Sequence, residues 1–173
     1  MIRAGYRLRQ MLAALRPSPA ADQLSQAGRQ LPPAQWQLFK AMPAAEQAHG
    51  LRVLDRLQTQ GEHNPDLLAA GLLHDVGKSL HPLAPWERAL AVLGRRLAPT
   101  ASWRWGAGPP HGWRRPFCVA RQHPDWGAEL VAATGASAAL VELIRRHQDE
   151  PSGANSSETS TLLRALQAAD DWS

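Results

Sequence analysis

"HNPDLLAAGLLHDVGK", residues 63–78, predicts one short helix that ends at two metal-capable side chains. Asn64 suits the N-cap, because its side chain can accept a hydrogen bond from a free backbone N–H. Pro65 suits the first helical position, where no backbone donor is needed. The apolar run that follows predicts a buried helix, and this helix places the pair His74 and Asp75 at its C-terminus.

Helical patterns also dominate the remainder of the 173-residue chain. Ala, Leu, Arg and Gln are abundant, and no stretch sustains the alternation of β-branched or aromatic residues with polar ones that is typical of strands. The fold class is therefore predicted to be all-α. Further helices are expected over residues 2–16, 33–41, 44–59, 85–98, 117–122, 125–133, 136–148 and 158–170.

Two segments interrupt the helical pattern. Residues 98–116, APTASWRWGAGPPHGWRRP, contain too much proline and glycine to continue a helix, so we expect an irregular Trp/Arg-rich excursion. "RPSP" at 16–19 ends the first helix, and a short linker is expected after it. We therefore divide the chain into an N-terminal helix with its linker, 1–32, and one compact helical bundle, 33–173.

The composition of the chain excludes some classes of protein and favours others. The single cysteine, Cys118, excludes an intrachain disulfide framework and a multi-cysteine zinc site, and it suits the cytoplasm. No apolar run is long enough for a membrane helix and no secretory signal begins the chain, so we expect a soluble cytoplasmic protein. Residues 86–121 hold seven Arg and one Glu, which favours phosphate-bearing partners.

Several histidines and aspartates interrupt the apolar faces of the expected helices. His49 shares a helical face with Val53, and Pro124 biases His123 to extended geometry just ahead of a helix start. Six side chains from five segments are expected to point inward: His49, His74, Asp75, His123, His147 and Asp170.

A shared cation is one explanation for so many inward ionisable groups. A buried carboxylate is costly unless it is paired or bound to a metal. The alternative is that each histidine is simply hydrogen-bonded inside the core. Because ordinary cores rarely collect six such groups, we expect one or two divalent metal ions where these side chains meet.

The order of these residues resembles that in the HD superfamily of metal-dependent phosphohydrolases. The resemblance covers roughly residues 45–171. Five segments carry it: AHGLRVLDRL (48–57), LLAAGLLHDVGK (67–78), HPDWGAELV (123–131), LIRRHQDE (143–150) and LQAADDW (166–172). It implies a helical bundle of the HD-domain type and an enzyme that cleaves a phosphate mono- or diester, of a nucleotide, with metal-activated water.

The resemblance also implies how the ligands divide. Two sets share Asp75: His49, His74, Asp75 and Asp170 for one metal, and His123 and His147 for a second metal that Asp75 bridges to the first. Imidazole and carboxylate ligands suit Mn, Fe, Co, Ni or Zn, with Mg less favoured. Asp171 adjoins the closing ligand, so that assignment is open by one position, although the preceding "AAD" favours Asp170.

Three cations are candidates for contact with the substrate's phosphate. Lys78 lies one turn beyond Asp75 and is placed to neutralise charge on the phosphoryl group. We therefore expect Asp75 and Lys78 to be the catalytic residues. The alternative for Lys78 is a solvated cation favoured by the helix dipole. Arg114 and Arg115 are expected to bind phosphate if the excursion forms a lid. The alternative, which we favour, is that its tryptophans pack onto the domain.

The chain departs from the best-known relatives. It has no "GYP" element, and Gln148 follows His147 where two-metal HD-GYP proteins carry a further histidine, which argues against a cyclic di-GMP phosphodiesterase. The spacing is similar to that of smaller HD hydrolases, including those that cleave dinucleoside polyphosphates. Two other classes stay open: a noncatalytic HD module that senses a nucleotide, and an RNA-binding domain that uses the Arg-Trp stretch. We expect a small phosphorylated partner rather than nucleic acid.

Overall fold

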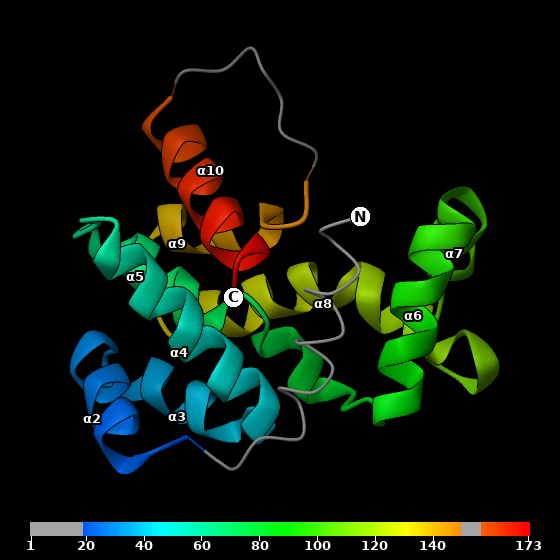
Figure 1. Ribbon diagram of the computed structural model, residues 1–173, viewed down its shortest axis with the longest axis horizontal. Helices are drawn as coiled ribbons and strands as arrows, with labels where there is room; N and C mark the ends of the chain where they lie inside the picture. The colour runs from blue at the N-terminus through cyan, green and yellow to red at the C-terminus, as the bar shows by residue number, and fades with distance from the viewer. Residues whose placement is uncertain (1–18, 150–156) are drawn as a thin grey trace.

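The computed structural model describes residues 19–149 and 157–173, and within these ranges every regular element is helical (Figure 1). The elements in chain order are α2 (Ala21–Gln30), α3 (Pro33–Ala41), α4 (Ala44–Thr59), α5 (Pro65–Leu73), η1 (Val76–Leu80), α6 (Pro85–Leu97), α7 (Pro99–Trp105), η2 (Gly112–Arg114), α8 (Arg115–Ala132), α9 (Ala138–Arg146) and α10 (Glu158–Asp171). The all-α prediction is confirmed. None of these described helices has the length and apolar character that a membrane crossing requires.

Helix α5 starts and stops where its sequence predicts. The Asn64 side chain accepts a hydrogen bond from the Leu67 N–H at 3.1 Å, and Pro65 is the first helical residue. The helix ends at Leu73, so that His74 is its C-cap. Asp75 follows with φ −96° and ψ 5°, a turn conformation that separates α5 from the short helix η1. The His-Asp pair therefore lies at a sharp change of chain direction.

Helix α5 forms the centre of the core. Its residues from Leu67 to Leu73 are all buried, and it contacts α2, α3, α4, α9 and α10. A helix that is apolar on every side is stable only where other helices surround it. This central position carries the end of α5, and with it His74, into the interior.

Two glycines allow the ligand-bearing segments to approach closely. A Cβ on Gly50 would lie 2.7 Å from the backbone oxygen of Leu72, so only glycine lets α4 approach α5 at this point. A Cβ on Gly77 would overlap the backbone carbonyl of His123, so η1 lies directly against α8. These contacts set the separation between the helices that carry the histidines.

Helix α8 is one continuous helix, which corrects the prediction of a break near Pro124. Pro124 lies inside it, and His123 therefore has helical rather than extended backbone geometry. An internal proline costs about 3 kcal/mol, because it removes one backbone hydrogen bond and crowds the preceding turn. Burial of nine residues along α8, among them Phe117 and Val131, offsets that cost.

The excursion at 98–116 is more regular than predicted. It contains helix α7 and the short turn η2, and the rings of Trp105, Trp113 and Phe117 pack edge to face with one another. Phe117 belongs to α8, so Trp105 packs onto the domain, as the favoured alternative expects, whereas Trp103 and Trp113 stay largely exposed. No residue of this segment lines the pocket described below.

The region before α3 also differs from expectation. Residues 21–30, which the sequence analysis assigns to a linker, form helix α2. Ala27 and Leu31 are buried in the same core as α5, so apolar burial stabilises this helix. The helix expected over residues 2–16 lies outside the described residues.

Candidate metal centre

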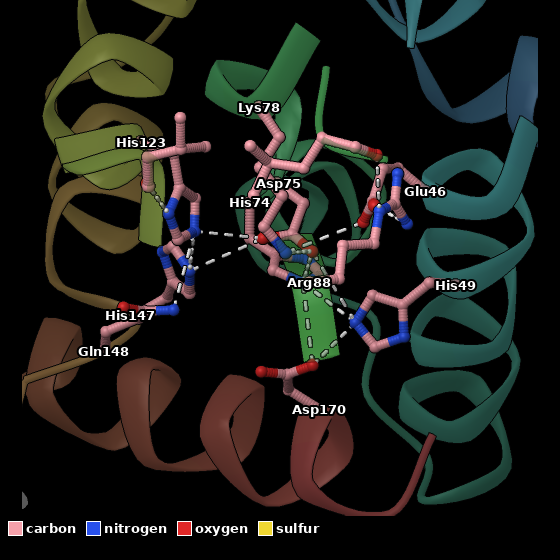
Figure 2. Close-up of polar contacts among 12 residues, drawn as sticks. Glu46, His49, His74, Asp75, Lys78, Arg88, His123, His147, Gln148 and Asp170 are labelled. Atoms are coloured by element: carbon pink, nitrogen blue, oxygen red, sulfur yellow. Dashed lines mark hydrogen bonds and ion pairs between the residues drawn. The ribbon is translucent and has the colours of Figure 1, made fainter. Parts of the chain in front are cut away.

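Six imidazole and carboxylate side chains from distant parts of the chain meet in the interior (Figure 2). They come from five places in the fold: His49 from α4, His74 and Asp75 from the junction of α5 with η1, His123 from α8, His147 from the C-cap of α9, and Asp170 from the last turn of α10. Their ligand atoms form two groups, and within each group all of these atoms lie within 4.8 Å of one another. The side chains that the sequence singled out therefore lie together.

The first group consists of His49, His74 and Asp170. Oδ1 of Asp170 lies 2.7 Å from Nε2 of His49 and 3.6 Å from Nε2 of His74. The two Nε2 atoms are 3.2 Å apart. Asp171, the other candidate for the closing position, is exposed and belongs to neither group. The geometry thus selects Asp170.

The second group consists of Asp75, His123 and His147, all of them buried. Oδ1 of Asp75 lies 3.1 Å from Nε2 of His123 and 3.8 Å from Nε2 of His147. Its other oxygen, Oδ2, faces the first group, 3.6 Å from Nε2 of His74 and 3.9 Å from Nε2 of His49. One carboxylate therefore lies between the two groups, as a bridging ligand would.

The histidine ring orientations favour metal binding over a hydrogen-bonded core. Three Nδ1 atoms lie within hydrogen-bond distance of a backbone oxygen: His74 with Gly71 (3.1 Å), His123 with Val119 (3.0 Å) and His147 with Ile144 (2.7 Å). A carbonyl oxygen only accepts, so each Nδ1 donates its proton, and in a neutral ring the Nε2 then keeps a lone pair. In the neutral rings of His123 and His147, two lone pairs then face each other at 3.2 Å, which is unfavourable unless a cation lies between them. The donor set fits a divalent metal ion.

The buried imidazoles of the second group are neutral. Burial, followed by the neighbouring imidazoles, lowers the pKa of His147 to about 3. Burial also lowers the pKa of His123, against the opposing effect of Asp75. A neutral imidazole is the form that binds a metal, so both rings are prepared for ligation.

The carboxylates are ionised. Burial by itself would raise the pKa of Asp75, but Lys78 and the adjacent imidazoles hold it well below its ordinary value. Burial likewise opposes ionisation of Asp170, and the histidines beside it hold its pKa far below the usual range. Against burial, the two carboxylates raise the pKa of His74 to about 9. When no metal is bound, a proton on His74 therefore balances negative charge of Asp75 and Asp170.

A pocket of about 290 Å³ opens beside the two groups and is lined partly by His49, Asp75 and His123. Four cations also line it: Arg52, Lys78, Arg88 and Arg95. Apolar surface comes from Leu83, Ala91, Val92, Val119 and Ala120. Positive charge next to apolar surface matches the chemistry of a phosphorylated small molecule.

Glu46 is a buried acid that the sequence analysis did not single out. Its Oε1 lies 2.6 Å from a terminal nitrogen of Arg88, and its Oε2 lies 3.6 Å from Nζ of Lys78. Lys78 in turn donates to Oδ2 of Asp75 at 2.6 Å. Burial opposes the charge on Lys78, but these two carboxylates raise its pKa. The position of Glu46, three residues before His49 on one face of α4, is the sequence signal that points to this role.

Arg114 and Arg115, for which the sequence analysis expects contact with phosphate, are not among the residues that line the pocket. Arg115 donates to the Glu87 carboxylate at 2.7 Å and to the backbone oxygen of Pro82 at 2.7 Å. The Arg114 guanidinium lies 5.2 Å from the ring centre of Trp113. The cations that line the pocket come instead from α4, α6 and η1. The two arginines of the excursion stabilise the packing of the excursion itself.

Comparison with protein-family models finds one family, the HD domain, over residues 47–173. Searches of curated proteins and of solved structures return no match. The matched residues span most of the chain and include all six ligand candidates. The chain therefore belongs to the HD domain family, within the superfamily of metal-dependent phosphohydrolases.

Proposed function

We propose that this protein is a metal-dependent phosphohydrolase that cleaves a phosphate mono- or diester of a nucleotide with an activated water. One observation carries the proposal. Two groups of imidazole and carboxylate ligands share Asp75 and lie against a pocket lined by cations. A hydrolytic site needs both the ligands and the pocket. The ligands hold the ions that activate water, and the cations of the pocket hold a negatively charged substrate.

Each residue of the site has a role that follows from its contacts. Divalent ions, when bound by the six ligands, would lower the pKa of a water and polarise a phosphoryl oxygen. Asp75 presents one oxygen to each ligand group, so it fixes the spacing of the two groups. Lys78 holds Asp75 in this orientation and lines the pocket, where its ammonium can neutralise charge on the phosphoryl group. Arg52, Arg88 and Arg95 attract the anionic substrate.

Metal-dependent release from a general phosphodiester and a phosphomonoester reporter tests the proposal. The protein with bound Mn or Fe is expected to hydrolyse at least one reporter, and a chelator should abolish this activity. An Asp75→Ala variant should lose both turnover and bound metal. Asp125→Ala, an exposed carboxylate on α8, is the matched control and should retain both. A metal-loaded protein that is inert towards both reporters and a nucleotide panel would contradict the proposal.

The second candidate is a noncatalytic sensor that binds a nucleotide in the same pocket. The complete ligand set favours the hydrolase, since a protein that only binds does not need an activated water. Equilibrium binding of a nucleotide to the metal-loaded protein, without release of product over a long incubation, would favour the sensor.

A further inference from the structure

We propose that helix α6 docks on an anionic phospholipid surface through an apolar stripe on its side away from the pocket. The spacing of four, three and four residues places the members of this α6 stripe along one side of the helix: Trp86, Leu90, Leu93 and Leu97. None of them lines the pocket or belongs to a group of candidate ligands. The docking surface is therefore separate from the candidate metal centre.

The other sides of α6 serve for packing and for the pocket. Glu87 and Ala91 are buried, where the helix contacts α7 and α8. Arg88 and Arg95 line the pocket, and at about 100° per residue they lie on the side opposite the α6 stripe. Figure 1 shows α6 and α7 at one edge of the molecule, with α2 and α5 near the other. The α6 stripe therefore lies on an outer edge, and docking there leaves the pocket wall facing away from the lipid.

The α6 stripe is exposed along its length. The exposed fractions are 67% for Trp86, 52% for Leu93 and 71% for Leu97. Among the residues that the structure describes, six of the eight large apolar side chains that are exposed lie between residues 86 and 113. Single exposed apolar residues are ordinary, whereas a group of them on one part of the surface indicates a binding site.

The charge of this region complements an anionic surface. Residues 86–121 hold seven Arg and one Glu, and that acid, Glu87, is buried and pairs with Arg115 at 2.7 Å. Arg96 is exposed and flanks the α6 stripe, about 180° around the helix from the buried side. Apolar side chains and unneutralised positive charge therefore occur together on α6.

A phospholipid surface satisfies both features. Leucine and tryptophan side chains leave water at the boundary between headgroups and acyl chains, while arginine remains among the anionic headgroups. A second copy of the chain would bring like charges together at the same patch. A nucleic acid offers phosphates but no apolar surface for the two exposed leucines. The combination of groups on α6 therefore favours the lipid.

Co-sedimentation of the full-length protein with phospholipid vesicles tests the apolar part of the proposal. Wild type is expected to bind mixed vesicles of phosphatidylcholine and phosphatidylserine, and to bind phosphatidylcholine vesicles more weakly. Trp86→Gln should lower the partition coefficient onto mixed vesicles by about tenfold, because the indole no longer leaves water, and it should retain wild-type turnover. Trp172→Gln is the matched control. It removes a tryptophan of similar exposure, 70%, at the end of α10 and should bind like wild type.

A second pair of variants tests the charge. Arg96→Gln should lower the partition coefficient onto mixed vesicles by about fivefold, the effect of one basic residue beside an anionic membrane. Arg29→Gln removes an exposed arginine from the last turn of α2 and changes the net charge by the same amount. It should leave vesicle binding unchanged.

The proposal is wrong if wild type does not bind mixed vesicles. It is also wrong if binding is sensitive to salt but equal in Trp86→Gln and wild type, since a basic protein is then attracted without docking. Loss of vesicle binding on chelation would show that headgroups bind at the metal centre instead. Self-association or oligonucleotide binding that depends on Trp86, without vesicle binding, would assign the α6 stripe to a second copy or to nucleic acid and overturn the proposal.

Discussion

Asp170 and Asp171 show how one position along a helix separates a candidate ligand from a surface residue. A step of one residue turns a side chain by about 100° around the helix axis. Asp170 therefore contacts His49 at 2.7 Å, while its neighbour Asp171 is exposed. Chemically the two carboxylates are identical, so only their direction distinguishes them.

Asp170→Asn is expected to weaken metal binding, because the amide oxygen carries no charge to offset that of the cation. Metal affinity should fall by at least about 100-fold, since loss of an indirect partner of a ligand already costs about 10–100-fold. Metal-to-protein ratios after dialysis, with turnover of a reporter, measure the effect. Asp171→Asn is the matched control and should resemble wild type. A stronger effect of Asp171→Asn than of Asp170→Asn would reassign the closing ligand.

At the scale of elements, an ion pair connects the start of α6 to the start of α8. The Glu87 carboxylate accepts from Arg115 at 2.7 Å and from the Ala84 N–H at 2.8 Å. Burial raises the pKa of Glu87, but these hydrogen bonds outweigh burial and lower it below its ordinary value of 4.5. Because the unfolded chain binds the proton more readily, the stabilisation is complete above the unfolded pKa and disappears as the pH falls through the folded pKa.

Glu87→Gln is therefore expected to lower the free energy of unfolding at neutral pH by about 1.5–3 kcal/mol. The difference from wild type should narrow in acid, where Glu87 of wild type is also uncharged. Urea unfolding at both pH values measures this. Glu129→Gln removes an exposed carboxylate from α8 and should change the unfolding free energy by less than about 0.5 kcal/mol. A Glu87→Gln deficit that is constant with pH would show that packing, not charge, explains the effect.

The contact between η1 and α8 fixes the distance between Asp75 and His123. Gly77→Ala adds a methyl group where the His123 backbone already lies, so α8 must shift. We expect a loss of about 1–3 kcal/mol in unfolding free energy, together with weaker metal binding.

Gly28→Ala is the control for this substitution. Gly28 lies in α2, and its added Cβ would meet only the Trp36 ring, at 3.8 Å. Replacing a glycine inside a helix with alanine should be neutral or stabilise the protein by about 0.5–1 kcal/mol. Thermal unfolding and metal titration of both variants measure the contrast. Wild-type metal affinity in Gly77→Ala would mean that the η1–α8 contact does not position the ligands.

For the whole molecule, the candidate metal centre joins five segments that span residues 49 to 170. A ligand that binds only the folded chain stabilises it by mass action. With free metal at about 100 times its dissociation constant, the gain is about 2.7 kcal/mol, or roughly 5–11 °C in thermal midpoint for a chain of this size. Chelation of the wild type should therefore lower the midpoint by that amount. The thermal midpoint of Asp75→Ala should not respond to chelator. If chelation left the midpoint of wild type unchanged as well, the proposal that a metal bridges the segments would be wrong.

The sequence predicts most of the helices because their signals are local. Asn64 and Pro65 mark the start of α5, and Ser157 caps the start of α10, where its side chain accepts from the Ser160 N–H. Long-range packing decides the exceptions. Burial along α8 carries the helix through Pro124, and the core that encloses Ala27 makes a helix of the expected linker. Neither effect is visible in a short window of sequence.

For the site, the sequence by itself determined which imidazoles and carboxylates interrupt apolar faces, since helical periodicity assigns each residue to a face. Only the tertiary structure decided what surrounds them. It placed Asp75 between two groups of candidate ligands, put Arg88 and Arg95 of α6 in the lining of the pocket, and left Arg114 and Arg115 outside that lining. The physical reason is that the direction of a side chain depends on its own helix, whereas its neighbours depend on how several helices pack.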